Sequence, residues 1–131
     1  MPTDRFDHLF IVPRSFDAAL AFYRDTLGWT VRHAWGSPDG EPRGAMLDGG
    51  GTALVIAEQH AADDRSWSDG VHGSRPTLHL AVDDLEARHA QLVAAGAGLR
   101  IVVPPEATHW GTRWFVVRDP DDNLIAFEQQ L

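Results

Sequence analysis

Hydrophobic positions in the first half of the chain alternate between strand-like runs and one helical stretch. The run from His8 to Val12 is short and apolar, and Pro13 ends it, which predicts a strand. Ser15 can cap a helix, and Gly28 can end it. Three strand-like segments follow, WTVRHAW, AMLDGGG and TALVIAEQ, and polar or glycine-rich turns separate them. The predicted order is β-α-β-β-β. The helical spacing rests on Phe16, Ala19, Leu20, Tyr23 and Leu27.

The second half repeats this order of elements. Leu78 to Val82 predicts a strand, and Asp83 with Glu86 resembles a capping box at the start of a helix. Gly96 ends that helix. The segments LRIVV, TRWFVVRDP and NLIAFEQQL then predict three more strands, so the order is again β-α-β-β-β.

Spacing between matching segments indicates an internal duplication. Leu54 opens LVIAEQ and Leu124 opens LIAFEQ, 70 residues later, while Phe16 and Leu85 open the two helices 69 residues apart. The sequence therefore predicts an α+β fold of two βαβββ modules, whose mixed sheets curve around a central cleft that can hold a small molecule. A single domain, 1–131, would comprise module one (5–59), a polar linker (60–75) and module two (76–131).

Composition narrows the possible partners. A chain of 131 residues that is 44% apolar and 23% charged is typical of one globular domain. It has no cysteine, no signal-peptide pattern at its start and no apolar run of membrane-spanning length, so we predict a cytoplasmic protein with no membrane partner. A net charge of −8 and the absence of lysine disfavour nucleic acid.

Two stretches carry a family resemblance. FDHLFIVPRSFDAALAFYRDTLGW resembles the opening of the vicinal oxygen chelate superfamily, and HWGTRWFVVRDPDDNLIAFEQ is similar to its closing hairpin. That superfamily includes glyoxalase I, bleomycin-resistance proteins, fosfomycin-resistance enzymes and extradiol dioxygenases. Asp122 stands where the family usually has glycine, and aspartate tolerates a left-handed turn. The resemblance implies a glyoxalase-like fold and a homodimer; the superfamily holds metalloenzymes and metal-free binders alike.

The resemblance also implies a candidate metal site. Family members take one ligand from the first strand and one from the last strand of each module, which here are His8, Glu58, His79 and Glu128. Two imidazoles and two carboxylates suit one divalent ion, such as nickel, zinc, manganese or iron. Glu58 or Glu128 would then also be a catalytic base, in a glyoxalase-like lyase or isomerase or in a dioxygenase.

Register weakens this metal-site hypothesis. In metal-binding relatives the second histidine falls at the position of Thr77, the last glutamate at that of Ala126, and the partner of Ala126 in the repeat is Ile56. Three candidates therefore lie two residues along their strands, while His8 is in register. Two residues move a side chain about 6.6 Å, whereas metal–ligand bonds are about 2.0–2.2 Å long. We therefore predict that the four side chains do not share one ion.

Aromatic residues support a binding site that needs no metal. Trp110 and Trp114 are four residues apart and share a strand face, Trp35 lies at a strand end, and Trp67 lies in the linker. His79 alternates with two leucines and faces the cleft if these pack on the helix. His8 is the further candidate for a ligand-binding wall, while each tryptophan can also belong to the core or to a dimer interface.

The predicted function is metal-independent binding of a small organic molecule, aromatic or cationic, in the cleft, as in bleomycin-resistance proteins. Stacking or cation–π contacts with tryptophan would contribute about 0.5–2 kcal/mol each. No cofactor is then needed. The alternative is the divalent-metal enzyme with His8, Glu58, His79 and Glu128 as ligands. Whether the chain is an enzyme stays open at this level, and the sequence does not name the ligand.

Overall fold

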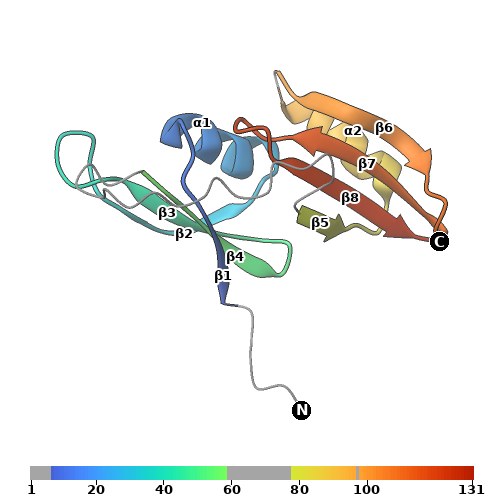
Figure 1. The fold of residues 1–131 in the computed structure, drawn as a ribbon, viewed down its shortest axis with the longest axis horizontal. Helices are drawn as coiled ribbons and strands as arrows, with labels where there is room; N and C mark the ends of the chain where they lie inside the picture. Colours follow the sequence, from blue (N-terminus) through green and yellow to red (C-terminus); the bar gives the residue numbers. More distant parts are fainter. Residues whose placement is uncertain (1–6, 59–77, 97) are drawn as a thin grey trace, which may run out of the picture. The chain divides into compact units, whose positions relative to one another are not determined.

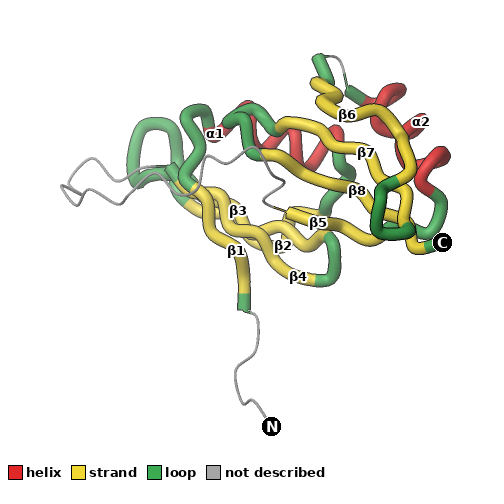
Figure 2. The backbone as a smooth tube through the Cα atoms, turned by 45° about the vertical axis from the view of Figure 1, so that its right-hand side comes forward, coloured by secondary structure: helices red, strands yellow, loops and turns green. Residues whose placement is uncertain are grey.

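Two compact units, Met1–Asp64 and Arg65–Leu131, make up the chain. The structure, a computed structural model, describes residues 7–58, 78–96 and 98–131. Each unit contains one helical segment and a four-stranded mixed sheet (Figures 1 and 2). The strand orders are β1-β4-β3-β2 and β5-β8-β7-β6, with the β1–β4 and β5–β8 pairs parallel and the others antiparallel. The predicted fold of two βαβββ modules is confirmed; the cleft stays a prediction.

The helix of the first unit begins where the sequence predicts. Ser15 Oγ accepts a hydrogen bond from the Ala18 backbone N at 3.1 Å, and Gly28 follows the helix with a φ of 79°. The last part is a π-helix, in which Leu27 N donates to Phe22 O at 2.9 Å. The elements are β1 (His8–Ile11), α1 (Phe16–Leu20), η1 (Ala21–Thr26), β2 (Thr30–Trp35), β3 (Gly44–Gly49) and β4 (Thr52–Ala57).

The second unit departs from the prediction at two points. Asp84, not Asp83, caps its helix, with Oδ1 accepting from Ala87 N at 3.1 Å. The strand LRIVV is longer than predicted and includes Pro104 and Pro105, which an edge strand tolerates because its outer N–H groups need no partner. The elements are β5 (Leu78–Ala81), α2 (Leu85–Ala95), β6 (Arg100–Ala107), β7 (Thr112–Arg118) and β8 (Leu124–Gln130). In the described part of the chain, no helix is long and apolar enough to span a membrane.

Each sheet packs one face against the helix of its own unit. In the second unit, Arg88 of α2 lies over the Phe127 ring and His89 contacts Phe115, so the odd-numbered residues of β7 and β8 form this helix face. In the first unit, Arg43, in register with Ala45 and Leu47, lies over the ring of Phe16 in α1. We call the opposite face of each sheet its helix-free face.

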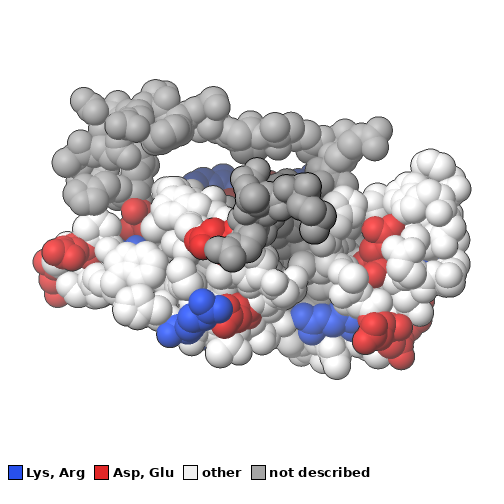
Figure 3. Space-filling view, turned by 90° about the horizontal axis from the view of Figure 1, so that it is seen from below, with Lys and Arg blue, Asp and Glu red and all other residues white. Residues whose placement is uncertain are grey.

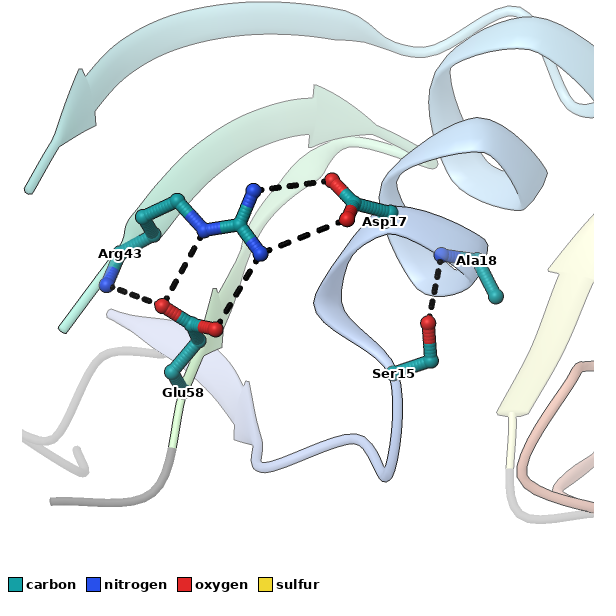
Figure 4. A network of polar contacts seen from close by, with 5 residues as sticks. All are labelled: Ser15, Asp17, Ala18, Arg43 and Glu58. Carbon is teal, nitrogen blue, oxygen red and sulfur yellow. Dashed lines mark hydrogen bonds and ion pairs between the residues drawn. The ribbon is translucent and has the colours of Figure 1, made fainter. Parts of the chain in front are cut away.

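An ion pair ties each sheet to the first turn of its helix. Arg43 binds Asp17 of α1 at 3.0 Å, and Arg113 binds Glu86 of α2 at 2.8 Å (Figure 4 shows the first pair). The two arginines are 70 residues apart and the two acids 69 (113 − 43 and 86 − 17), so these are equivalent contacts in the duplicated unit. They fix the register of the internal repeat independently of letter-by-letter similarity.

The same comparison aligns the last strands with an offset of 71. Ile11 pairs with Ile56 in the first sheet, and Leu80 pairs with Phe127 in the second, which places Ile56 and Phe127 in equivalent positions (127 − 56 = 71). Glu58 is therefore the equivalent of Gln129, whose Oε1 accepts from the backbone N of Leu85 at the start of α2. The sequence repeat, with its offset of 70, misaligns these strands by one residue.

Candidate functional site

A row of directly opposed residues crosses the helix-free face of the second sheet. Trp114 of β7 pairs with Glu106 of β6 on one side and with Glu128 of β8 on the other. Paired residues on adjacent strands point to the same face, and adjacent strands lie about 4.8 Å apart. Trp114 therefore stands between two carboxylates on one face. Its indole Nε1 donates a hydrogen bond to Glu106 Oε1 at 2.9 Å.

Glu128 is held by neutral donors. Its Oε2 accepts hydrogen bonds from Trp110 Nε1 at 2.7 Å and from Thr112 Oγ1 at 2.6 Å. Its Oε1 lies 3.6 Å from His79 Nδ1, and the side chain is only 16% exposed. The hydroxyl of Thr112, followed by the Trp110 indole, lowers the pKa of the Glu128 carboxyl below its usual value, which keeps this group ionised at neutral pH.

Three aromatic rings surround this carboxylate. The ring centroids of Trp110 and Trp114 are 5.1 Å apart at an interplanar angle of 87°, an edge-to-face contact. His79 is stacked on Trp114, with centroids 6.4 Å apart and ring planes 28° from parallel. Trp110 lies in the turn before β7, not in the strand as the four-residue spacing predicts, and is 49% exposed. The two indoles are in contact, but Trp110 reaches Trp114 from this turn and not from a shared strand.

A small apolar cluster lies beside the rings on the same face. Val116, Leu124 and Ala126 are buried together, and Trp114 packs against them with Val103. His79 pairs with Ala126, so its side chain shares this face, as the alternation with Leu78 and Leu80 predicts. The helix-free face of the second unit therefore combines an apolar patch, three rings and two carboxylates.

The first unit places two more predicted binding residues on its own helix-free face. His8 pairs with Ala53, donates a 2.5 Å hydrogen bond from Nδ1 to Asp7 Oδ2, and meets the ring of Phe10 edge-on. Trp35 lies over Gly44, where an added Cβ would come within 2.2 Å of the indole, and 38% of the residue is exposed. The close approach of this ring to the strand requires glycine.

Glu58 lies elsewhere. It is in register with Arg43, which binds Asp17 of α1, so its side chain is on the helix side of the sheet, whereas that of His8 is on the helix-free face. The backbone N and the guanidinium of Arg43 donate to Glu58 at 2.7 to 3.2 Å, and these bonds lower the pKa of Glu58 (Figure 4). The donor set His8, Glu58, His79 and Glu128 therefore does not fit one metal ion.

The structure thus brings together four of the predicted site residues, all in the second unit: His79, Trp110, Trp114 and Glu128. Within residues 7–58, 78–96 and 98–131, no three or more His, Asp and Glu side chains gather as a metal ion requires. Trp67 lies outside the described residues. Thr112 and Glu106 join the cluster although the sequence analysis does not select them.

The sequence could have predicted the place of Thr112 in this cluster, but not that of Glu106. Thr112 alternates with Trp114 at the start of a predicted strand, so its place on the same face follows from the period of two. Glu106 pairs with Trp114 only because the register of β6 shifts twice, between Ile101 and Val103 and between Val103 and Glu106. Such shifts leave no reliable mark in the sequence.

Several charged side chains elsewhere form ion pairs. Figure 3 shows basic side chains beside acidic ones on the face in view. Arginine–carboxylate pairs in the described residues include Arg24–Asp25, Arg32–Asp48 and Arg100–Asp122. Glu106 and Glu128 differ, since both are hydrogen-bonded to indoles.

Comparison with known proteins places this fold in a family. The profile of the Glyoxalase/Bleomycin resistance protein/Dioxygenase superfamily matches residues 5–127. The chain belongs to this superfamily. The resemblance seen in the opening and closing segments of the sequence is thereby confirmed. Comparison with curated protein sequences gave no match.

Several solved structures resemble the whole chain. TnmS3, an antibiotic binding protein from Streptomyces sp. CB03234, is 25% identical, with a TM-score of 0.71, and the match covers 100% of this chain and 99% of that one. TioX from Micromonospora sp. ML1 is 21% identical, with a TM-score of 0.72 and coverage of 98% and 100%. A superfamily protein from Alicyclobacillus acidocaldarius is 22% identical, with a TM-score of 0.68 and coverage of 100% and 94%. At such identities the last two show the fold alone.

Proposed function

We propose that this protein binds a small organic molecule on the helix-free face of its second sheet, without a metal ion. The observation that carries the proposal is the single cluster formed by Trp110, Trp114, His79 and Glu128. Half-exposed indole and imidazole rings beside an apolar patch offer a stacking surface for a planar compound. The likeness to an antibiotic binding protein supports a binding role over a scaffold role.

The position of Glu58 supports metal-independent binding. A ligand carboxylate must be free to reach the ion, but Glu58 is held by Arg43 on the helix face of its sheet. A divalent-metal enzyme is the alternative, and the approach of His79 to Glu128 at 3.6 Å is the observation in its favour. Elemental analysis of protein purified without chelator or metal-affinity tag separates the two: about one ion per chain would support the enzyme.

Calorimetric titration with a panel of planar aromatic compounds tests the proposed binding. We expect Trp110→Ala and Trp114→Ala to weaken the affinity of any compound that binds by about tenfold or more, since each removes a stacking partner. Trp29→Phe is the control, because Trp29 belongs to the first unit and packs on Tyr23 of η1. Equal affinities in all four proteins would contradict the proposal. The predicted homodimer, in contrast, is tested by light scattering of the purified protein.

A further inference from the structure

The second helix-free face carries two carboxylates that are not paired with any arginine of the described residues. Glu128 accepts from Trp110 and Thr112, and Glu106 accepts from Trp114; in the described residues neither pairs with an arginine. Of the two arginines of β7, Arg113 points to the helix face and binds Glu86, whereas Arg118 lies on the helix-free face and donates to the backbone O of Asp122. Indole and hydroxyl groups orient a carboxylate but leave its formal charge in place.

Several carboxylates elsewhere in the described residues are bound by arginine. Five arginines in the described residues pair with carboxylates, including one that binds two: Arg24, Arg32, Arg43, Arg100 and Arg113. His79 is the basic group beside Glu128, and its Nδ1 lies 3.6 Å from Oε1, which is longer than a normal hydrogen bond.

We infer that the ligand is a planar cation, whose positive group lies beside the Trp110 and Trp114 rings between Glu106 and Glu128. The inference rests on the proposed function and names its ligand class. An aromatic ring attracts a cation through its electron-rich face, and the attraction increases when the pair is partly desolvated. Glu128, 16% exposed, supplies the partly buried countercharge, and its Oε1 accepts no hydrogen bond of normal length.

Geometry within the row explains why two carboxylates serve one ligand. Glu106 and Glu128 are two strands apart, about 9.6 Å between backbones, with Trp114 midway. A cation on the midway indole is therefore flanked by negative charge on both sides. Each carboxylate also fixes one indole through its N–H, so the same groups that attract the charge hold the rings in position.

Three probes that share one ring system separate charge from shape. N-methylquinolinium is a permanent planar cation, quinoline is uncharged at neutral pH, and quinoline-2-carboxylate is an anion. Each is titrated to millimolar concentration into full-length protein with ¹⁵N-labelled tryptophan, and the indole N–H resonances are followed by NMR. Trp110→Phe and Trp114→Phe assign the two resonances. The tested variants are Glu128→Gln and Glu106→Gln, because glutamine still accepts from an indole; the control is Glu86→Gln, which removes the same charge from the helix face.

We expect N-methylquinolinium to bind about tenfold more tightly than quinoline, and each tested variant to reduce this preference by about fivefold or more. The control variant Glu86→Gln should keep the preference for N-methylquinolinium over quinoline. The preference should also fall with added salt, since partly exposed charges are screened. If Glu128→Gln fails to fold, the Glu106→Gln variant still tests the cation inference, because Glu106 is exposed.

Other outcomes distinguish the two hypotheses. If quinoline or its carboxylate binds as tightly as the cation, or if both variants keep the preference, the cation inference is wrong while the proposed binding face stands. If no probe moves either indole resonance, the cation inference and the proposed binding face are both rejected.

Discussion

Glu58 and Glu128 occupy opposite sides of their respective sheets, although nearly identical segments, LVIAEQ and LIAFEQ, contain them. Glu58 is bonded to Arg43, which also binds Asp17 in α1, whereas Glu128 is bonded to Trp110 and Thr112 on the helix-free face. The structural equivalent of Glu58 is Gln129, which contacts the start of α2. One glutamate therefore fastens a helix to its sheet, and the other belongs to the proposed binding face.

Replacing Glu58 should lower stability and leave ligand binding unchanged. Glu58→Gln removes the negative partner of Arg43, which then retains only Asp17. We expect a lower midpoint of urea unfolding, with the same N-methylquinolinium affinity as wild type. A matching loss of affinity would place Glu58 in the binding site after all. Glu86→Gln, at the equivalent ion pair of the second unit, should lower the midpoint in the same direction.

Acid should remove the contribution of Glu58 to the stability of the folded protein. The pKa of Glu58 is lower in the folded protein than in the unfolded chain, chiefly because Arg43 donates to its carboxylate. Its stabilising effect is therefore complete above the unfolded value, about 4.3, and is lost as the pH falls through the folded pKa. Urea unfolding of wild type and Glu58→Gln should converge below that range. A constant difference from neutral pH down to strong acid would contradict this assignment.

The hydroxyl of Thr112 should be required for the charge state of Glu128. Thr112 is 4% exposed and donates to Glu128 at 2.6 Å. Thr112→Val removes the donor with little change in shape, so we expect the pKa of Glu128 to rise and unfolding to require about 1–3 kcal/mol less free energy. Thr112→Ser keeps the hydroxyl and should therefore keep most of the lowered pKa of Glu128 and most of the free energy of unfolding. Carbon-13 NMR titration of the glutamate carboxyl groups measures the pKa; an unchanged value in Thr112→Val would refute the role.

Two glycines of β3 should tolerate alanine to different degrees. A Cβ at Gly49 would lie 2.0 Å from the Trp29 ring, which is packed on Tyr23, whereas one at Gly44 would lie 2.2 Å from Trp35, which is 38% exposed. The exposed ring can move away and the packed ring cannot. We expect Gly49→Ala to lower the free energy of unfolding by about 1–3 kcal/mol and Gly44→Ala to lower it less. Chemical denaturation measures both changes. The reverse order would contradict the structure.

Metal removal should not affect ligand binding. Because His8 and Glu58 lie on opposite faces of the first sheet and cannot bind one ion together, dialysis against a chelator should leave the affinity for N-methylquinolinium unchanged. Adding nickel, zinc or manganese afterwards should have no effect either. A loss of affinity on dialysis, restored by one of these ions, would favour the divalent-metal alternative.

Periodicity in the sequence was sufficient for the elements and their order. The helical spacing after Ser15, the alternation around His79 and the repeated module are local patterns, and local backbone preferences decide them. The same alternation correctly puts His79 opposite the two leucines that flank it. The sequence by itself therefore determined two βαβββ modules and most of the strands that carry the site.

Only the tertiary structure decided which face each last strand presents. In β4 the residues from Ala53 to Ile56 are all buried, so no polar–apolar alternation marks the face. A difference of one residue in a turn then reverses every side chain of the strand, and letter similarity aligned Glu58 with the wrong partner. The place of Glu106 depends in the same way on register shifts in β6. Contacts such as Arg43 with Asp17 and Trp110 with Glu128 set these registers, and they join residues too distant in sequence for a local pattern to encode.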